Sequence, residues 1–357
     1  MKLAAILDNN CHIDKKYLNK AKKHTEKLII PHRAMGKLHN TAEKICAIRK
    51  TLKPDVDKRA VFIMVGDHGI VNEGVSSYPQ EVTLQMVNAF LNETAAVNVL
   101  AKQAKADVIV TDVGSFCTVE DVNRTDHNIF LQKKISRGTK NFLKEPAMSY
   151  EQAIKSIEIG FEVTNKYIIE KELNLIATGD MGIGNTTSSS AIGAVISGQG
   201  VEKLTGSGSG IDEKKLALKI NIIKSAIKLH NPDKNDAIDI LSKIGGFEIG
   251  AIAGSILAAA YNNIPIIIDG IISTSAALIA YTLKKEVSDY MIAGHMSAEP
   301  GHRIMLEYLE INPLLSLDMR LGEGTGALIA MHIIESAVKI TTDVATFEEA
   351  GVSTKNK

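Results

Sequence analysis

The sequence contains no tryptophan, and aromatic residues make up only 4% of its 357 residues. It also lacks a net charge, because 41 Lys and Arg residues balance 41 Asp and Glu residues. A neutral chain without a basic cluster is not typical of nucleic-acid-binding proteins. The 45% hydrophobic content is therefore built mainly from Ile, Leu, Val and Ala. That composition favours buried parallel strands covered by helices.

Cysteine is scarce as well: Cys11, Cys46 and Cys117 are scattered and show no CxxC spacing. The pattern predicts neither a disulfide framework nor a cysteine zinc site, and it is typical of a reducing cytoplasm. The apolar run within Met1–Asp8 is too short for a secretion signal. We therefore expect a cytoplasmic protein.

A long apolar membrane segment is not expected either. The longest uncharged stretch, Ile249–Ile268, is interrupted by Asn262, Asn263 and Pro265. These residues predict a buried helix, a turn and a buried strand, and a membrane span is the weaker interpretation.

Short apolar runs alternate with helical patterns from residue 59 onward, whereas residues 1–58 are helical in pattern and rich in lysine. Such alternation predicts βαβ units and an α/β fold with a parallel sheet. The predicted strands are Ala60–Val65, Ala106–Val113, Leu173–Thr178, Ile264–Ile268 and Tyr290–Ala293. The predicted helices include Pro79–Leu91, Thr94–Lys105, Ser149–Lys171, Asp212–His230 and Ile249–Tyr261.

Polar side chains follow each predicted strand directly. Ligands of parallel sheets bind beyond the carboxyl ends of the strands, so these side chains indicate a site. They are Asp67, His68, Asp112, Asp180, Asp269 and His295.

A stretch rich in glycine and hydroxyl residues, Gly179–Ser190, joins a predicted strand to a predicted helix. Free amides and hydroxyls at a helix start form an anion-binding site, and phosphate is its expected ligand. The stretch has neither the lysine of a P-loop nor a third glycine at Thr187, where a dinucleotide fingerprint needs one. A tight turn with Ser and Thr caps is the alternative interpretation. The candidate phosphate-binding residues here are Gly182, Ile183, Gly184, Asn185 and Thr186.

A second glycine-rich stretch, residues 206–210, precedes the predicted helix at Asp212. A flexible loop is its ordinary interpretation, but beside an anion-binding loop it could fold over a phosphate. Lys219 could then reach back with a positive charge, although a surface lysine is the default. Ser297, after the fifth predicted strand, could add a hydroxyl.

The stretch Met319–Ala327 alternates three glycines with Glu323 and Thr325 before a long apolar helix. Glycine there permits unusual backbone conformations and close approach of a ligand. Glu323 is either a first-turn helix charge or a catalytic carboxylate. The surrounding phosphate loops favour the catalytic interpretation.

A metal-dependent hydrolase built on Asp67, His68 and His295 is one alternative. The two histidines have no HxxxH or comparable ligand spacing, so we predict no metal and expect them to order loops through hydrogen bonds.

From about Lys58 to Ala337 the sequence resembles the nicotinate-nucleotide–dimethylbenzimidazole phosphoribosyltransferase family, which makes α-ribazole phosphate for the lower ligand of cobamides. Order, spacing and residue type all match. The matching segments are Gly66–Gly69, Tyr78–Thr83, Gly182–Thr187, Leu241–Glu248, Asp269–Gly270, His295–Glu299 and Met319–Ala327.

The resemblance implies a Rossmann-like domain at residues 59–337 and a small helical domain from residues 1–58 and 338–357. It implies a dimer, small-molecule substrates and no cofactor. Glu323 would be the general base, with Asp180 as a second carboxylate. The nucleotide would be held by residues of the loops 182–186 and 206–208, with Lys219 and Ser297. The residues implied to contact the base or the phosphate are Tyr78, Met86, Leu321, Gly206, Ser207 and Gly208.

Two segments depart from the family pattern. Asp180 stands where the family usually has Glu, and Arg33–His39 replaces a Lys-Pro-x-Gly-Ser-Leu-Gly motif. The alternatives are therefore an enzyme for phenolic bases, one subunit of an unlike pair, or a catalytically weak partner of an active paralogue. The preferred aromatic base and the choice between homodimer and heterodimer stay open.

Overall fold

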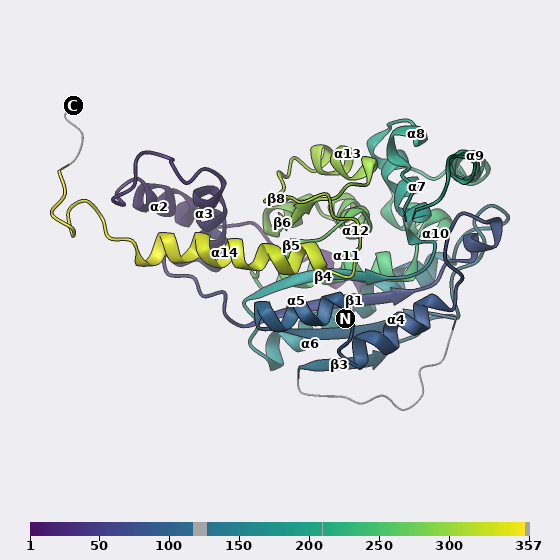
Figure 1. The fold of residues 1–357 in the computed structure, drawn as a ribbon, viewed down its shortest axis with the longest axis horizontal. Coiled ribbons are helices and arrows are strands. Elements are labelled where there is room, and N and C mark those ends of the chain that lie inside the picture. Colours follow the sequence, from purple (N-terminus) through teal and green to yellow (C-terminus); the bar gives the residue numbers. More distant parts are fainter. Residues whose placement is uncertain (117–126, 209, 354–357) are drawn as a thin grey trace.

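The computed structural model describes residues 1–116, 127–208 and 210–353, so Cys117 lies outside the described residues (Figure 1). Within these ranges the centre is a six-stranded parallel sheet of order β3-β2-β1-β4-β5-β6. The strands are β1 Arg59–Gly66, β2 Ala106–Gly114, β3 Asn128–Gln132, β4 Leu175–Met181, β5 Ile266–Ile268 and β6 Met291–Ala293. This is the strand order of Rossmann folds, so the predicted α/β class is confirmed. Sequence reasoning missed β3, whose polar ends leave an apolar run of only a few residues.

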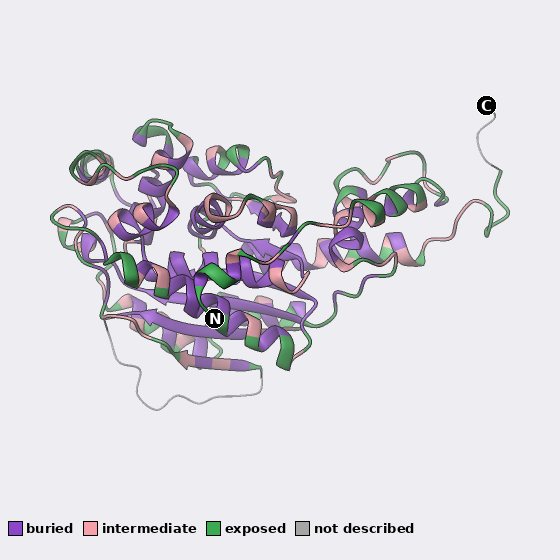
Figure 2. Ribbon diagram, turned by 180° about the vertical axis from the view of Figure 1, so that it is seen from behind, coloured by how far each residue is buried: buried purple, intermediate pink, exposed green. Residues whose placement is uncertain are grey.

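Strand β1 shows how the sheet separates two cores. Its side chains alternate, so Val61, Ile63 and Val65 enter one hydrophobic cluster while Phe62 and Met64 enter the other. Both faces are therefore buried, as Figure 2 shows for the strands. The helices on one face are α4 Val82–Leu91, α5 Ala96–Ala104 and α14 Thr325–Asp343, and those on the other are α6 Tyr150–Glu170, α11 Phe247–Tyr261 and α12 Ile271–Leu283.

Helices α6 and α11 pack with their backbones in contact. A Cβ added to Gly160 would lie 1.9 Å from the carbonyl oxygen of Ala251, and one added to Gly254 would lie 2.1 Å from that of Ile157. Glycine at both positions lets the two backbones touch. The predicted helix after Ser149 is confirmed, and Ser149 and Gln152 form a capping box at its start.

Helices α7 Asn185–Ser197, α8 Val201–Leu204, α9 Glu213–His230 and α10 Ala237–Ile244 lie toward the end of the molecule opposite α2 and α3 (Figure 1). The other elements are η1 Gly69–Glu73, η2 Lys285–Tyr290, which contacts α3, β7 His295–Met296, α13 Pro300–Tyr308 and β8 Leu315–Ser316. The predicted helix at 212–230 is confirmed in α9.

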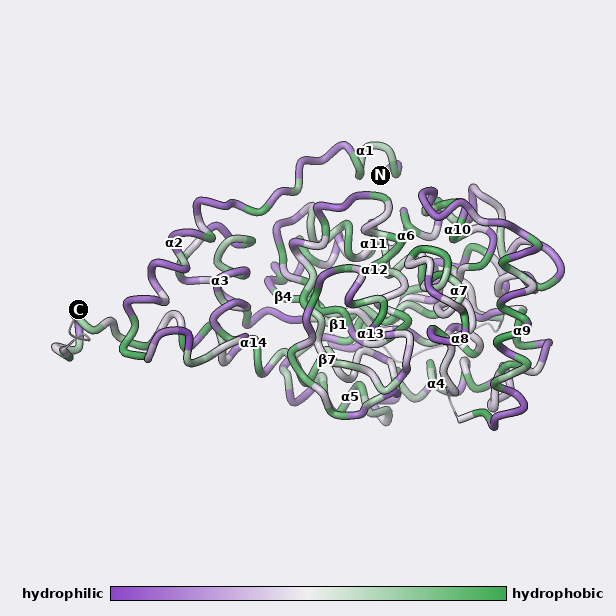
Figure 3. The backbone as a smooth tube through the Cα atoms, turned by 90° about the horizontal axis from the view of Figure 1, so that it is seen from above, coloured by the Kyte–Doolittle hydropathy of each residue, from purple (hydrophilic) through white to green (hydrophobic). Residues whose placement is uncertain are grey.

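Helices α2 (Lys15–Thr25) and α3 (Lys37–Arg49) pack together beside the distal part of α14 and project from the main body (Figure 3). Leu28 and Thr346 form an isolated bridge there. Helix α1 (Leu3–Leu7) instead docks on α6. The division into residues 59–337 and a helical unit from 1–58 and 338–357 remains a proposal. In the described ranges, no helix is both long and apolar enough to cross a bilayer.

Candidate active site

The candidate site lies where the strand order reverses, between β1 and β4. A Cβ added to Gly182, just after β4, would lie 1.9 Å from the carbonyl oxygen of Gly66 at the end of β1. The two loops can meet at this distance only because residue 182 has no side chain. Crevices of this kind are the usual ligand sites of doubly wound sheets.

Glu323 stands in the turn that opens α14, as the glycine pattern predicts. Three successive residues adopt positive φ: Gly322 at 85°, Glu323 at 61° and Gly324 at 84°. Positive φ is costly for a glutamate, and such strain is typical of functional sites. The Glu323 side chain is buried, and its Oε2 atom has no hydrogen-bond partner among the described residues.

Burial, followed by the nearby carboxylate of Asp269, raises the pKa of Glu323 from 4.5 to about 7. The backbone amide of Val97, in the first turn of α5, lowers the pKa. Desolvation therefore prevails over the favourable amide. A carboxyl group with a pKa close to neutral can both accept and release a proton at physiological pH.

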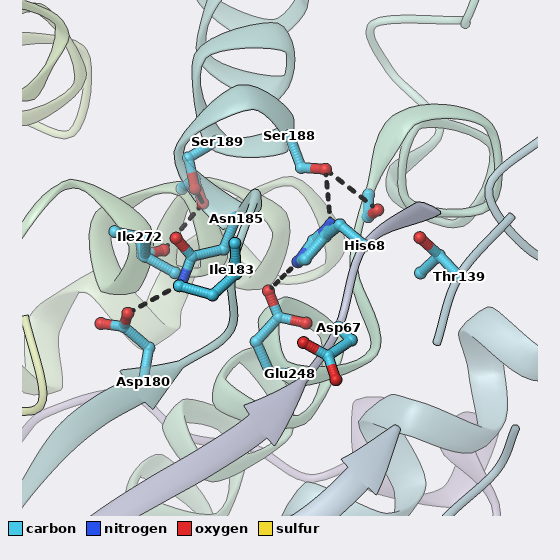
Figure 4. A network of polar contacts seen from close by, with 12 residues as sticks. Asp67, His68, Thr139, Asp180, Ile183, Asn185, Ser188, Ser189, Glu248 and Ile272 are labelled. Carbon is cyan, nitrogen blue, oxygen red and sulfur yellow. Dashed lines mark hydrogen bonds and ion pairs between the residues drawn. The ribbon is translucent and has the colours of Figure 1, made fainter. Parts of the chain in front are cut away.

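Two more carboxylates share this buried space. Asp180 Oδ2 accepts a hydrogen bond from Asn185 Nδ2 at 2.9 Å, and Oδ1 has no partner among the described residues (Figure 4). Burial, followed by the charges of Asp269 and Glu248, raises the pKa of Asp180 well above its usual range. Asp269 accepts hydrogen bonds from the amides at the start of α14. The carboxylates thus suppress one another's ionisation.

The two histidines of the hydrolase alternative have structural contacts. His68 lies between Glu248, whose Oε1 is 2.6 Å from Nε2, and Ser188, whose Oγ is 3.0 Å from Nδ1 (Figure 4). His295 Nε2 lies 3.7 Å from Asp269 Oδ1. No group of three or more His, Cys, Asp or Glu residues in the described part of the chain is arranged to hold a metal ion.

Asp67 and Asp112 order loops. Asp67 accepts hydrogen bonds from Thr83 Oγ1 at 2.6 Å and from the amide of Phe116 at 2.8 Å. Asp112 accepts from the amide of Ser115 at 2.8 Å, within its own loop. Both carboxylates therefore stabilise the ends of β1 and β2, although the strand-end rule grouped them with the site.

The predicted anion-binding end, formed by Thr186, Gly206, Gly208 and Lys219, gathers around the Lys219 amine, and this lysine is only 1% exposed. Its Nζ donates to Thr186 Oγ1 at 2.9 Å and lies 3.5 Å from the carbonyl oxygen of Gly206. Gly208, with φ of 53°, passes close to both the Thr186 hydroxyl and the lysine. Burial lowers the pKa of Lys219 to about 8, while Glu299 opposes this shift. A cation, a hydroxyl and a glycine-rich backbone thus converge, as phosphate binding requires.

Ser297 is fixed by a buried histidine. Its amide donates to His302 Nδ1 at 2.8 Å, and His302 Nε2 lies 2.9 Å from Thr274 Oγ1. Burial lowers the pKa of His302 to about 3, so the ring is neutral. Since Nδ1 accepts from the amide, Nε2 carries the proton and donates to Thr274. The Ser297 hydroxyl in turn accepts a hydrogen bond from the amide of Glu299.

The segment that carries Glu323 is tied to the anion-binding end by two hydrogen bonds. Arg320 Nη1 donates to the carbonyl oxygen of Gly208 at 3.0 Å. The amide of Ala298 donates to the carbonyl oxygen of Met319 at 2.9 Å. The carboxylate and the anion loops therefore belong to one connected site.

Three apolar side chains were expected beside a flat ligand. Tyr78 and Leu321 are 51% and 58% exposed, whereas Met86 is half-buried against the α4 side of the sheet. Ile183, also half-buried, packs on the same core as Met86, and its amide donates to Thr83 Oγ1 at 3.2 Å. Of the three expected side chains, only Leu321 belongs to the segment that leads into the turn at Glu323.

Sequence reasoning missed the contacts of Glu248, Glu299 and Arg320. Glu248 meets His68 across 180 residues of sequence, which no local pattern reveals. All three residues did stand within the segments that carry the family resemblance, and that was the only available signal.

Known proteins resemble this chain over nearly its whole length. A family model described as "Phosphoribosyltransferase" matches residues 11–352. Proteins called nicotinate-nucleotide–dimethylbenzimidazole phosphoribosyltransferase in Dehalococcoides mccartyi strain BAV1 and Geobacter sulfurreducens are 47% and 43% identical, over 96% and 98% of both chains. The crystal structure of the enzyme of that name from Thermus thermophilus superimposes with a TM-score of 0.89 at 38% identity, covering 96% of this chain and 100% of the other. The chain therefore belongs to the nicotinate-nucleotide–dimethylbenzimidazole phosphoribosyltransferase family.

Proposed function

We propose that this chain is a pentosyltransferase that moves the phosphoribosyl group of nicotinate mononucleotide to an aromatic base. The base is 5,6-dimethylbenzimidazole or a related azole, and the products are an α-riboside 5′-phosphate and nicotinate. The α-riboside serves the assembly of the cobamide nucleotide loop. Membership of the family supports the reaction, and the buried Glu323 beside an anion-binding end supports the assignment of the site.

Glu323 is the proposed general base. It takes the proton from one nitrogen of the azole, and the lone pair of the other nitrogen forms the new bond to C1′ of the ribose. The bond from C1′ to the nicotinate ring breaks, and its electron pair passes to the ring nitrogen, which loses its positive charge. Attack from the opposite face inverts C1′ and gives the α-riboside. A pKa of about 7 for Glu323 suits this role, because about half of the population is ready to accept a proton at neutral pH.

The 5′-phosphate of the nucleotide is proposed to occupy the space around Lys219. The loops with Gly182, Ile183, Gly184, Asn185 and Thr186, and with Gly206, Ser207 and Gly208, would supply amides and hydroxyls, and Ser297 would add its hydroxyl. A bound phosphate dianion would also reverse the lowering of the Lys219 pKa, since an opposite charge favours the protonated amine. Phosphate binding and lysine protonation thus support each other.

The aromatic base is proposed to lie against Tyr78, Met86 and Leu321, near the turn of Glu323. Asp180 is the second carboxylate, placed close enough to Glu323 for the two charges to interact. Positioning two flat reactants in this way contributes a large part of the rate. The reaction as proposed needs neither a cofactor nor a metal. A cytoplasmic homodimer is the proposed form, with a heterodimer as the alternative.

The test is release of nicotinate from nicotinate mononucleotide in the presence of benzimidazoles, purines and phenols, one base at a time. We expect release with at least one base and a loss of roughly a hundredfold or more in kcat for Glu323→Gln, as for removal of a positioned base. The matched control is Glu170→Gln, an exposed carboxylate on α6 whose loss leaves the site intact. Undiminished turnover by Glu323→Gln would refute the role of this residue. Release only with phenols, or only after addition of a paralogue, would favour the alternatives.

A further inference from the structure

The start of α14 lacks the side-chain cap that such helices normally have. Its N-cap residue is Gly324, which makes no side-chain cap hydrogen bond. The first amides of a helix have no partner within it and need acceptors from elsewhere. Here the acceptor is Asp269, at the carboxyl end of β5. Its Oδ2 accepts from the amide of Gly324 at 3.3 Å, and its Oδ1 accepts from the amide of Ala327 at 2.8 Å.

These two hydrogen bonds fix the residues on the C-terminal side of Glu323. On the N-terminal side, the Thr325 hydroxyl donates to the carbonyl oxygen of Gly322 at 2.8 Å. Together they enclose the three residues with positive φ. A glutamate with positive φ is strained and persists only where the surroundings hold it. The Asp269 carboxylate, which is 0% exposed, restrains the turn from the carboxyl end of β5, more than 50 residues away in the sequence.

We propose that Asp269 is a positioning residue for Glu323: its carboxylate holds the turn that aims the base, and its negative charge faces Glu323 in the same buried space. This inference rests on the proposed function of Glu323. Asp269 contacts no substrate atom in this scheme and acts only through its neighbour. A simple helix cap would supply the hydrogen bonds alone, whereas the proposal assigns the charge a role as well.

Several ionisable groups lie near Asp269 and Glu323. Asp180 faces them from β4, Glu248 adds its charge to Asp180 from α11, and His295 lies 3.7 Å from Asp269 on β7. Burial raises the pKa of Asp269, and the charge of His295 opposes that shift, so His295 helps to keep Asp269 ionised. Burial is the largest cause that raises the pKa of Glu323, and Asp269 is the second. Neutralising Asp269 therefore lowers the pKa of Glu323 while burial still holds it above its ordinary value.

Asp269→Asn is the decisive variant. The amide oxygen can still accept from Ala327, but the charge and the acceptor for Gly324 are lost. We expect the acidic limb of the pH profile of kcat/KM to move down by about 0.5 to 1 pH unit. Because the turn is less firmly held, we expect kcat to fall roughly ten- to a hundredfold. The KM for nicotinate mononucleotide should change less than about threefold, since the residues around Lys219 are untouched.

Asp112→Asn is the matched control. Asp112 is an equally buried aspartate at the carboxyl end of a strand, and it also accepts backbone amides. Its loss should leave the acidic limb where it is. If both variants lower kcat without moving the limb, Asp269 is a structural cap only, and the proposal is overturned.

A second measurement does not depend on activity. In protein labelled with ¹³C at the glutamate carboxyl carbon, the resonance of Glu323 is identified by its disappearance in Glu323→Gln. Its titration midpoint should lie near 7 in the parent protein and lower in Asp269→Asn. An unchanged midpoint in Asp269→Asn contradicts the role proposed for Asp269, even if the enzyme turns over no base tested. The measurement therefore separates failure of this inference from failure of the proposed function. If Asp269→Asn does not fold, a parent midpoint near 4.5 overturns the proposal, because the charge of Asp269 would then have no effect on Glu323.

Discussion

The buried base should make the protein less stable as the pH rises, and Glu323→Gln should remove that cost. The folded chain holds the Glu323 proton up to about pH 7, whereas the unfolded chain releases it near 4.5. Between these values the folded state binds more protons, so the free energy of unfolding falls with increasing pH. The stabilisation is fully present below 4.5 and is lost as the pH passes 7. Glutamine has nearly the same shape and carries no charge, so the variant lacks this dependence.

The size of the effect follows from the pKa change. A shift from 4.5 to about 7 corresponds to about 3 kcal/mol at about 1.36 kcal/mol per unit. Because unfolding entropy is about 2.1 cal/mol/K per residue, 357 residues give about 0.75 kcal/mol/K. The variant should therefore melt about 4 °C above the parent at pH 8, and at nearly the same temperature at pH 4.5. Relaxation of the native state around the charge makes this an upper value.

The assay is thermal unfolding of both proteins in parallel from about pH 4.5 to about pH 8.5. The difference in Tm between them is the quantity to plot, because the titrations of the other carboxyl groups are common to both chains. The charge of Glu323 also raises the pKa of Asp180. Its removal in Glu323→Gln makes ionised Asp180 less costly, which raises the Tm of the variant further at high pH. If the difference in Tm does not vary with pH, or if the variant melts below the parent at pH 8, then ionisation of Glu323 does not destabilise the folded protein.

Two further substitutions test the anion-binding end and the reversal point of the sheet. Lys219→Met should raise the KM for nicotinate mononucleotide about 10- to 100-fold, since a charge-assisted hydrogen bond contributes about 1.5–3 kcal/mol. Lys224 is exposed on the same helix, and Lys224→Met should leave this KM unchanged. Initial rates at varied concentrations of nicotinate mononucleotide give both values. Gly182→Ala should lower the Tm and abolish turnover, because its Cβ would lie 1.9 Å from the Gly66 oxygen. Gly200→Ala, where the nearest atom is a flexible Glu side chain at 3.2 Å, is the control; equal melting of the two variants would contradict the argument.

The sequence predicted the sheet well because its strands are buried on both faces. A run such as Ala60–Val65 is apolar at every position, so its type and limits are visible without any partner. Strand β3 has only one fully buried apolar residue, Phe130. Its place in the sheet depends on its pairing with β2, which a local pattern does not contain.

The site was predictable as a set of strand ends and loops, and less so as a set of contacts. The rule for parallel sheets placed Asp180 and Asp269 at one edge, and the glycine pattern placed Glu323 in a turn before a helix. The same rule included Asp112, which orders its own loop. The pairing of Asp269 with the amides of α14 spans more than 50 residues and could be found only in three dimensions.

The buried carboxylates suit the charge that the proposed reaction consumes. In that proposal, nicotinate mononucleotide brings a cationic ring close to Asp180, Asp269 and Glu323, whose pKa values are raised, and a nearby cation favours their ionised forms. During transfer the ring nitrogen loses its positive charge and Glu323 gains the azole proton. An ion pair is thus converted into two neutral groups within a buried site, and low polarity disfavours separated charges. Burial of the carboxylates, which costs stability in the free enzyme, therefore favours the step that releases nicotinate.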